Sequence, residues 1–299
     1  MLILLTGATG FIGRHVLTAL LEKYGSQSVM VLSSKKITNV NCKIYASTRD
    51  FGIEQNAFNK VTHIIHAGAF TPKSSRSRNE ISACFSNIEY TKNLLSYKFD
   101  ALVRVVNISA VDVYGNSDAK LSENSLIAPE SLYGSSKLYC EQMIKSFSRI
   151  NQNDYINMRL GHVYGPGEEK YKKILPVAIK NILNNQHVDL WGDGSELRSF
   201  IFIDDVVKSI VNALTYPEGG LNINVVSSRQ TSILELLNLL MLVSEKHTEI
   251  RVIESNHIKR NVIFNNKTLM ETVLEEETDL MLGLKSEYEY MKRMHESGI

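Results

Sequence analysis

The chain has 299 residues, which is enough for a large hydrophobic core and for one α/β domain with a smaller lobe beside it. Charged residues make up 22% of it and the formal net charge is only +1, so the composition predicts no overall attraction to nucleic acid or to an anionic membrane. Three widely separated cysteines without a CxxC pair favour free thiols in a reducing cytoplasm, and we expect no metal site.

The first predicted strand runs directly into a glycine-rich turn. Leu2–Leu5 form a short apolar run without a polar face, which indicates a strand buried on both sides. Glycines follow at positions 7, 10 and 13, and a helical pattern starts at once. In a strand–turn–helix unit, Gly7 allows the tight turn, Gly10 lets a pyrophosphate approach the backbone, and Gly13 lets the helix pack closely. The segment therefore predicts a dinucleotide site at a helix N-terminus.

Strands and helices then alternate through the first part of the chain. We expect strands at Val29–Leu32, Cys42–Ala46, Val61–Ala67, Ala101–Ile108 and Tyr155–Leu160, and helices at Ile81–Phe99 and Glu130–Ile150. The polar segment Pro72–Asn79 is typical of a loop. This alternation predicts an α/β fold with a Rossmann-type, doubly wound parallel sheet.

The regular alternation ends after the sixth predicted strand. We expect further strands at Arg198–Ile203, Leu221–Val226 and Arg251–Glu254, and helices at Ile174–Leu183, at Asp204–Leu214 behind an Asp cap, at Ser232–Val243 and in the tail from Thr268. We expect residues 1–165 to form the NADP-binding domain, to which residues 200–225 return. Residues 166–199 and 226–299 would form a smaller C-terminal lobe that binds the substrate.

The cofactor preference depends on the end of the second predicted strand. In dinucleotide folds an acidic residue there binds the ribose hydroxyls, whereas basic residues without an acid indicate a 2′-phosphate. Here the strand ends in Ser33, Ser34, Lys35 and Lys36, and Arg14 follows the glycine turn. The sequence therefore favours NADP(H). The alternative is NAD(H), in which case the two lysines only belong to a solvated loop.

Tyr133 and Lys137 are candidate catalytic residues. They stand four residues apart at the start of a long predicted helix, so their side chains share one face. A phenol with a pKa of about 10 is a poor base at neutral pH, but a nearby ammonium and a cationic nicotinamide would lower that pKa. Tyr133 could then exchange a proton with a sugar hydroxyl or carbonyl, while Lys137 would also hold the nicotinamide ribose.

Segments along nearly the whole chain resemble the extended short-chain dehydrogenases/reductases. This family contains nucleotide-sugar epimerases, dehydratases and 4-ketoreductases. The resemblance rests on Thr6–Gly13, His66–Ala69, Asn87 with Thr91–Leu95, Val113–Gly115, Tyr133 with Lys137, Arg159–Gly167 and Arg198–Asp205. It implies that Asp50 and Phe51 lie at the adenine, that Asn87 braces the active-site strand, and that Arg198 binds a nucleotide diphosphate.

The expected cofactor site combines these implied positions with the residues discussed above. Its members are Gly7, Thr9, Gly10, Phe11, Ile12, Gly13, Arg14, Ser33, Ser34, Lys35, Asp50, Phe51, Ala67, Gly68, Ala69, Asn87, Tyr133 and Lys137.

The chain departs from the family pattern at Ala110, where members usually carry the Ser or Thr that binds the reacting oxygen. Ser109 is one residue earlier, and a regular strand would turn its side chain to the other face. Either the strand end is irregular and Ser109 is the third catalytic residue, or Tyr133 works without that partner.

Two further positions bear on the reaction, and with Arg198 they are the expected substrate contacts. Dehydratases of the family have an Asp-Glu pair where this chain has Val111 and Asp112, which argues against dehydration. Asp112 is then either a second acid/base or a loop carboxylate. His162 stands where many members have Asn, and it either contacts the sugar, acts as an acid or is a packed polar side chain.

We therefore expect a cytoplasmic enzyme that uses NADPH to reduce the C4 ketone of a nucleotide-activated 4-keto-6-deoxyhexose. The close rival is a nucleotide-sugar 4-epimerase, a dehydratase is less favoured, and the remote alternative is a protein that binds NADP(H) without catalysis. By resemblance, the helices around Ile81–Phe99 and Gly134–Ile150 would pair with their copies in a homodimer.

Overall fold

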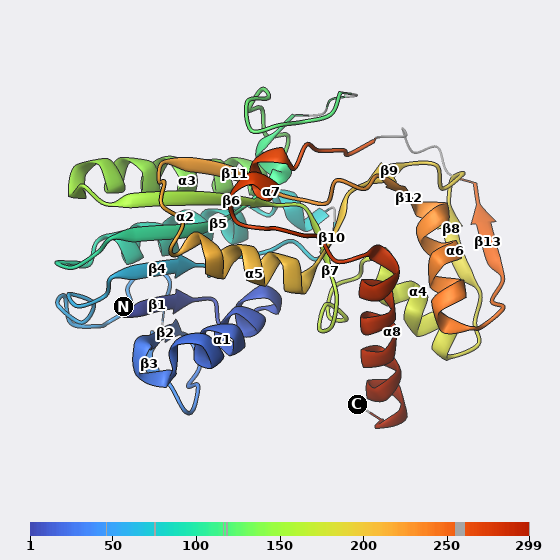
Figure 1. Ribbon diagram of the computed structural model, residues 1–299, viewed down its shortest axis with the longest axis horizontal. Helices are drawn as coiled ribbons and strands as arrows, with labels where there is room; N and C mark the ends of the chain where they lie inside the picture. The colour runs from blue at the N-terminus through green and yellow to red at the C-terminus, as the bar shows by residue number, and fades with distance from the viewer. Residues whose placement is uncertain (46, 75, 116, 118, 255–260, 299) are drawn as a thin grey trace.

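A parallel β-sheet forms the centre of the protein. The computed structural model describes residues 1–45, 47–74, 76–115, 117, 119–254 and 261–298. Within these ranges the sheet has seven strands in the order β11-β6-β5-β4-β1-β2-β3 (Figure 1). They are β1 (Ile3–Thr6), β2 (Val29–Ser33), β3 (Asn41–Ile44), β4 (His63–His66), β5 (Arg104–Ala110), β6 (Asp154–Leu160) and β11 (Leu221–Val225). The predicted Rossmann-type α/β fold is confirmed.

Helices cover both faces of the sheet. Helices α1 (Phe11–Tyr24) and α5 (Ile203–Ala213) pack together on one face, and α2 (Ile81–Leu95) and α3 (Leu132–Asn151) pack together on the other (Figure 1). Alternate residues of β1 serve the two sides: Leu5 belongs to the core beneath α1, whereas Leu4 belongs to the cluster beneath α2 and α3. This two-sided burial explains why the strands are continuous apolar runs rather than alternating ones.

The smaller C-terminal lobe stands beside the carboxyl edge of the sheet (Figure 1). Its helices α4 (Ile174–Leu183), α6 (Ile233–Ser244) and α8 (Leu280–Glu296) pack on one another, and α8 also contacts β10. The lobe's remaining elements are short, namely β8 (Val188–Trp191) paired in parallel with β13 (Ile250–Ile253), β9 (Leu197–Arg198) paired antiparallel with β12 (Thr231–Ser232), and α7 (Lys267–Thr272). Outside these ranges, β7 (His162–Tyr164) pairs in parallel with β10 (Phe200–Phe202).

The predicted strand at Arg198–Ile203 is confirmed only in part, because the segment forms two short strands that have different partners. β9 pairs antiparallel with β12, whereas β10 pairs in parallel with β7, and the buried Ser199 separates them. The predicted Asp cap of the next helix is wrong. Phe202 is the N-cap of α5 and makes no side-chain cap, while the Asp205 carboxylate accepts hydrogen bonds from Thr278.

Ala46 of the third predicted strand, and residues 255–260 and 299 of the predicted substrate lobe, lie outside the described residues. In the part of the chain that is described, no helix is long and apolar enough to cross a membrane.

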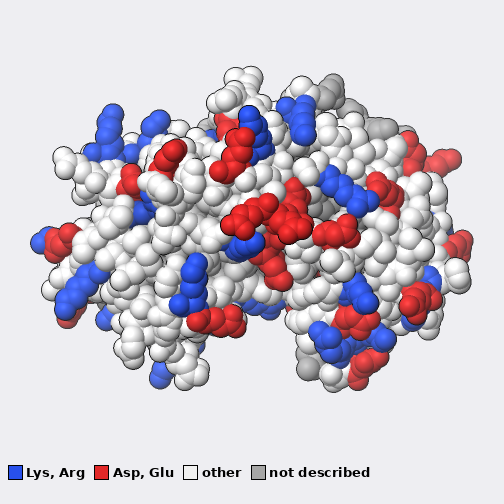
Figure 2. Space-filling model, in the orientation of Figure 1, with Lys and Arg blue, Asp and Glu red and all other residues white. Residues whose placement is uncertain are grey.

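On the face shown in Figure 2, acidic and basic side chains are interspersed, with acidic ones gathered near the middle.

Candidate active site

The glycine turn has the steric features that the sequence predicted. Gly7 adopts φ +73°, and a Cβ there would lie 2.5 Å from the main chain of Ala67. A Cβ on Gly13 would lie 2.0 Å from the carbonyl oxygen of Gly7, so only glycine lets α1 pack this closely on the turn. Gly10 is the N-cap of α1 and contributes no side-chain cap. The N-terminus of α1 thus offers main-chain N–H groups beside open space, which suits a pyrophosphate.

Two adjoining cavities, of about 1030 Å³ and about 260 Å³, lie along the carboxyl edge of β1 and β4. They share Gly7, Gly10, Ala67, Ala69 and Phe70 on their walls. Most predicted site residues line one or both: Gly7, Thr9, Gly10, Phe11, Ile12, Gly13, Ala67, Gly68, Ala69, Asn87, Ser109, Asp112, Tyr133, Lys137 and His162. The glycine cradle and this paired space fit a dinucleotide next to a second ligand.

Tyr133 lies in the first turn of α3 and is 8% exposed. Ser131 caps this helix by accepting a hydrogen bond from the Gly134 N–H at 3.1 Å. A Cβ on Gly134 would lie 2.1 Å from the Asp112 carbonyl oxygen, so this glycine lets the Asp112 loop approach Tyr133. Burial, followed by the Asp112 carboxylate, raises the pKa of Tyr133 far above its ordinary value, while the nearby Thr71 side chain opposes the shift.

Lys137 shares the larger cavity with Tyr133, as their spacing on the helix predicted. Its ammonium is buried and donates to the Ile108 carbonyl oxygen at 2.6 Å. Burial lowers the pKa of Lys137, and the nearby Glu141 carboxylate acts in the opposite direction. The side chain is therefore held by the end of β5 at the wall of the cavity.

Charged side chains surround the open side of the larger cavity. Arg78 forms an ion pair with Asp112 beside Tyr133, and the cavity is also lined by Lys73, Lys170, Lys172 and Lys173. Within the described residues, no group of three or more His, Cys, Asp or Glu side chains is placed to hold a metal ion. The excess of basic groups suits a ligand with phosphates.

His162 faces the same cavity but is not equipped as an acid. Burial, followed by the positive charges of Arg198 and Lys173, lowers its pKa to about 3. The ring is therefore neutral at pH 7, and its buried Nδ1 makes no hydrogen bond in the structure. This leaves a sugar contact or a packed polar side chain as the roles that the sequence had proposed.

Arg198 is not among the residues that line either cavity. Its guanidinium donates to the Glu196 carboxylate at 2.7 Å and to the Leu197 carbonyl oxygen at 2.9 Å. A diphosphate at Arg198 would therefore have to lie beyond the described cavity walls or compete with Glu196.

The Ser109 hydroxyl belongs to a buried polar network around Glu141 and Arg159, and its hydrogen-bond partner is Glu141 rather than Tyr133. It donates to Glu141 at 2.5 Å, and Glu141 is bound by Arg159 through two contacts of 2.8 and 3.0 Å. Strand β5 remains regular through Ala110, which belongs to the same small apolar cluster as Tyr133. The interpretation that an irregular strand end makes Ser109 a catalytic partner is therefore corrected, because strand alternation turns its side chain to the other face.

Arg14 also differs from its prediction. Its guanidinium lies against Pro166 and Gly167, and Nη2 donates to the Pro166 carbonyl oxygen at 3.4 Å, so it is placed toward the C-terminal lobe rather than beside the end of β2. At the end of β2, Ser33 is buried and accepts a hydrogen bond from the Lys35 N–H, while Ser34 and Lys35 are exposed.

The two residues expected at the adenine lie outside the cavity linings. Phe51 is buried in an aromatic cluster with Tyr45, Tyr90 and Tyr97, and the Asp50 carboxylate accepts a hydrogen bond from the Gly52 N–H. Tyr45 and Tyr90, which both pack on Phe51, are the members of this cluster that line the smaller cavity.

The sequence missed several residues that line the cavities. Phe70 and Thr71 follow the small residues after β4 and reach the larger cavity. Their position just after a predicted parallel strand is a signal that could have found them. Tyr45 and Thr48 line the smaller cavity and come from a loop without a recognisable motif.

Comparison with known proteins agrees with this geometry. Residues 3–226 match the NAD dependent epimerase/dehydratase family. A candidate UDP-glucose 4-epimerase of Methanocaldococcus jannaschii is 30% identical over 249 residues, which cover 80% of this chain and 81% of that protein. The dTDP-4-dehydro-6-deoxyglucose reductase of Escherichia coli is 25% identical over 279 residues, which cover 87% of each chain.

Solved structures share the fold over the whole chain. The dTDP-glucose 4,6-dehydratase of Streptomyces venezuelae, solved with NAD and TYD bound, has a TM-score of 0.85 and 22% identity, and the match covers 99% of this chain and 98% of that one. Because the family match spans most of the sequence, the chain belongs to the NAD dependent epimerase/dehydratase family, an extended short-chain dehydrogenase/reductase family of nucleotide-sugar epimerases, dehydratases and reductases.

Proposed function

We propose that the protein is an NADP(H)-dependent reductase that acts on the C4 ketone of a nucleotide-activated 4-keto-6-deoxyhexose. The observation that carries the proposal is the position of Tyr133 and Lys137 on the wall of the larger cavity, which the glycine turn and several basic side chains also line. This arrangement brings a candidate proton donor next to one space for a dinucleotide and another for a phosphorylated substrate.

The proposed chemistry needs only a proton donor and positioning groups from the protein. When bound, the reduced nicotinamide supplies a hydride to C4. Tyr133 donates its proton to the ketone oxygen, which gains charge as the hydride arrives. Lys137 stabilises the resulting phenolate and holds the nicotinamide ribose, while the basic side chains at the cavity entrance bind the diphosphate.

The preference for NADP(H) is supported by the end of β2. Ser34, Lys35 and Lys36 are exposed there, and the strand ends without a carboxylate. A 2′-phosphate on the adenosine ribose would find cationic partners at this position, whereas a free 2′-hydroxyl would lack its usual acidic acceptor.

Dehydration is disfavoured because the segment after β5 has one acid rather than two. Val111 is buried in a small apolar cluster, and Asp112 is paired with Arg78. Removal of water across two carbons needs separate groups to act on the two of them, which this segment does not supply.

The second candidate function is a nucleotide-sugar 4-epimerase. The similarity to the candidate UDP-glucose 4-epimerase favours it, and Tyr133 and Lys137 would serve both directions of such a reaction. An epimerase keeps its cofactor bound and consumes none, which makes the two proposals separable in solution.

We also propose a homodimer and the division of labour between the two lobes given above. Ile81 and Phe85 on α2, and Leu132 and Tyr139 on α3, are large apolar side chains that are exposed in the single chain. Helices α2 and α3 lie side by side, so these residues could cover one another across a two-fold axis. Light scattering on Phe85→Glu would give a monomer mass if this face forms the dimer.

The function is tested with the purified protein and dTDP-, GDP- and CDP-linked 4-keto-6-deoxyhexoses. Stoichiometric oxidation of NADPH with one of these sugars is the expected result, and Tyr133→Phe should abolish it. Tightly retained NAD with no net NADPH consumption would favour epimerisation instead. If Tyr133→Phe leaves the turnover intact, the enzymatic role assigned to this residue is wrong.

A further inference from the structure

The two adjoining cavities suit the two halves of a dinucleotide. Tyr133 and Lys137 line only the larger cavity, so the nicotinamide half belongs there in the proposed function. Gly10, at the N-terminus of α1, lies on the wall of both cavities and suits the pyrophosphate in the middle of the cofactor. The smaller cavity, of about 260 Å³, is then the space left for the adenosine half.

The smaller cavity has two aromatic residues on its wall that the larger one lacks, Tyr45 and Tyr90. Their ring centroids lie 5.3 Å apart, and each ring also packs on Phe51, at 5.1 Å for Tyr45 and 5.2 Å for Tyr90. Phe51 lines neither cavity and is 3% exposed. Phe51 therefore supports the two tyrosines from the protein interior, and the tyrosines are the rings that a base in the cavity can reach.

The main chain holds Tyr45 beside the end of β2. The Tyr45 N–H donates a hydrogen bond to the Ser33 carbonyl oxygen at 3.1 Å. Ser33 is the last residue of β2, and the end of this strand is where a dinucleotide fold binds the adenosine ribose. A base in contact with Tyr45 would therefore lie next to the place that its own ribose needs.

Tyr90 lies close to the main chain of the segment after β4. A Cβ on Gly68 would come within 2.3 Å of Cε1 of Tyr90, so the missing side chain at Gly68 leaves room for this ring. The other side of the contact is also fixed, because Tyr90 stacks on His66, whose ring nitrogens lie 2.9 Å from the hydroxyls of Thr6 and Thr91. The Tyr90 ring is thus held in place by the fold, which lowers the entropy lost when a ligand binds.

We propose that Tyr45 and Tyr90 form the adenine-binding wall of the cofactor site, with the base packed against their rings in the smaller cavity. A planar purine is stabilised by aromatic neighbours through stacking or edge-to-face contact. The inference rests on the proposed function only for its dinucleotide cofactor. It holds for NAD(H) and NADP(H) alike, because both carry the adenine.

Isothermal titration calorimetry with NADPH and, separately, with NADH tests this wall. Tyr45→Leu keeps an apolar side chain but removes the ring, so it should raise both Kd values about tenfold or more and by the same factor. Tyr45→Phe keeps the ring and should bind as the wild type does. Tyr290→Leu, at a half-buried tyrosine of α8 outside both cavities, is the matched control. Wild-type affinity in Tyr45→Leu, or an equal loss in Tyr45→Phe, would overturn the proposal.

A second measurement locates the base directly. In protein deuterated except at its tyrosine rings, nuclear Overhauser effects from the adenine H2 and H8 of bound NADPH should reach two tyrosines. One contact should disappear in Tyr45→Phe and the other in Tyr90→Phe. A bound adenine without contacts to these two rings would overturn the proposal. Neither measurement uses a sugar, so a wild type that shows these contacts but reduces none of the sugars would count against the proposed function alone.

Discussion

At the scale of single residues, the chemistry depends on how firmly Tyr133 holds its proton. Burial and Asp112 raise its pKa, whereas Thr71 and Arg78 lower it. A raised pKa suits a group that must keep its proton until the substrate oxygen becomes basic. The ion pair between Arg78 and Asp112 therefore sets the electrostatic environment of Tyr133 as well as bridging two loops.

Asp112→Asn should move the pH dependence of the reduction to lower pH. Tyr133 must be protonated to donate, so kcat falls as the pH rises through its pKa in the ternary complex. Removing the Asp112 charge lowers that pKa, and the alkaline fall should begin roughly half to one pH unit earlier. The check is a kcat–pH profile with saturating substrates.

Arg78→Ala should shift the pH dependence of kcat in the opposite direction. It removes a positive charge that lowers the Tyr133 pKa, so the alkaline fall should shift to higher pH. Asp100→Asn removes an exposed carboxylate that pairs with Lys98, and it should leave the profile unchanged. Shifts of both variants in the same direction would contradict this account of the Tyr133 environment.

The cofactor preference is tested at the end of β2. Replacing both Lys35 and Lys36 with Ala should raise the KM for NADPH about tenfold or more, because each lysine can contribute a charge-assisted hydrogen bond to the 2′-phosphate. The KM for NADH should change little. Lys23→Ala, a basic residue in the last turn of α1, is the control. Equal effects on both cofactors would argue against a 2′-phosphate site.

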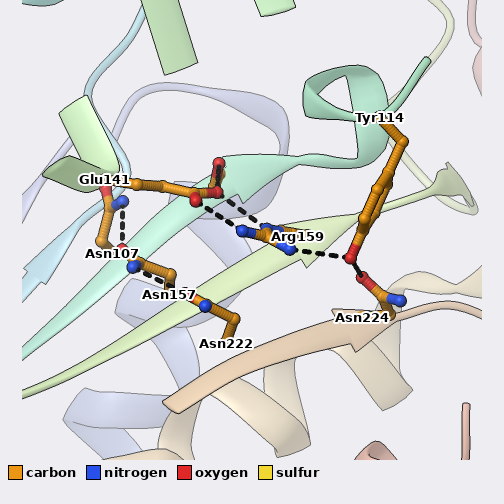
Figure 3. A network of polar contacts seen from close by, with 8 residues as sticks. Asn107, Tyr114, Glu141, Asn157, Arg159, Asn222 and Asn224 are labelled. Atoms are coloured by element: carbon orange, nitrogen blue, oxygen red, sulfur yellow. Dashed lines mark hydrogen bonds and ion pairs between the residues drawn. The ribbon is translucent and has the colours of Figure 1, made fainter. Parts of the chain in front are cut away.

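At the scale of secondary-structure elements, a buried ion pair connects the active-site helix to the sheet. Glu141 of α3 and Arg159 of β6 are both almost fully buried, and Arg159 also donates to the Tyr114 hydroxyl at 2.8 Å (Figure 3). The Tyr114 hydroxyl donates to Asn224 of β11 at 2.8 Å. The network thus joins α3, two neighbouring strands and the loop after β5.

Removing one partner of this ion pair should strongly lower the free energy of unfolding. Arg159→Met leaves the Glu141 carboxylate buried without its partner and should lower the free energy of unfolding by about 3–5 kcal/mol. The double variant Glu141→Leu/Arg159→Met removes both charges and should recover much of that loss. Urea denaturation measures both. Arg251→Met breaks an exposed pair with Asp189 and should cost less than about 1 kcal/mol. A double variant no more stable than Arg159→Met would contradict the prediction.

Local sequence patterns predicted the elements whose contacts are close in sequence. Helix α4 begins and ends where its apolar periodicity placed it, at Ile174 and Leu183. The segment from Arg198 to Ile203 was predicted as one strand because nothing local reveals a change of partner. β10 pairs with β7, whereas β9 pairs with β12, and both pairings depend on tertiary packing rather than on the segment's own residues.

The candidate site likewise contains residues that the sequence could place and contacts that it could not. The spacing of the glycines and of Tyr133 and Lys137 is itself the chemical signal, so the sequence could place these residues. The direction of Arg14 depends on where Pro166 and Gly167 fold, and the approach of the segment after β4 to helix α3 depends on Asn87. Such contacts follow from the packing of distant segments, which a single sequence does not encode in any local pattern.

At the scale of the whole molecule, the segment after β7 joins the C-terminal lobe to the dinucleotide helix. His15 of α1 hydrogen-bonds the Pro166 carbonyl oxygen at 2.8 Å, and the Phe11 ring packs against Tyr171. In the same segment, Lys173 lines the larger cavity and binds the Glu168 carboxylate at 2.8 Å. Glu287 of α8 is buried close enough to Glu168 for the Glu168 charge to raise its pKa, so the C-terminal helix lies near this wall of the cavity.

The two glutamates share one buried site, and Glu287 holds the proton. Both carboxyl groups are 1% exposed. Burial, followed by the Glu168 charge, raises the pKa of Glu287 well above 4.5, whereas Lys173 opposes the rise at Glu168. On unfolding, Glu287 releases its proton at any pH above its ordinary pKa. The wild type should therefore lose stability as the pH rises above about 4.5.

Glu287→Gln should remove this loss, because an amide has no proton to release on unfolding. The variant should be more stable than the wild type at pH 8 by on the order of 1–2 kcal/mol, and the difference should vanish below about pH 4.5, where the unfolded chain also keeps the proton. Thermal unfolding across that pH range measures it. Glu168→Gln should not stabilise, because it removes the acceptor of Lys173. A stability gain for Glu287→Gln that is independent of pH would mean that better packing explains it, and Glu287 would then not hold a buried proton.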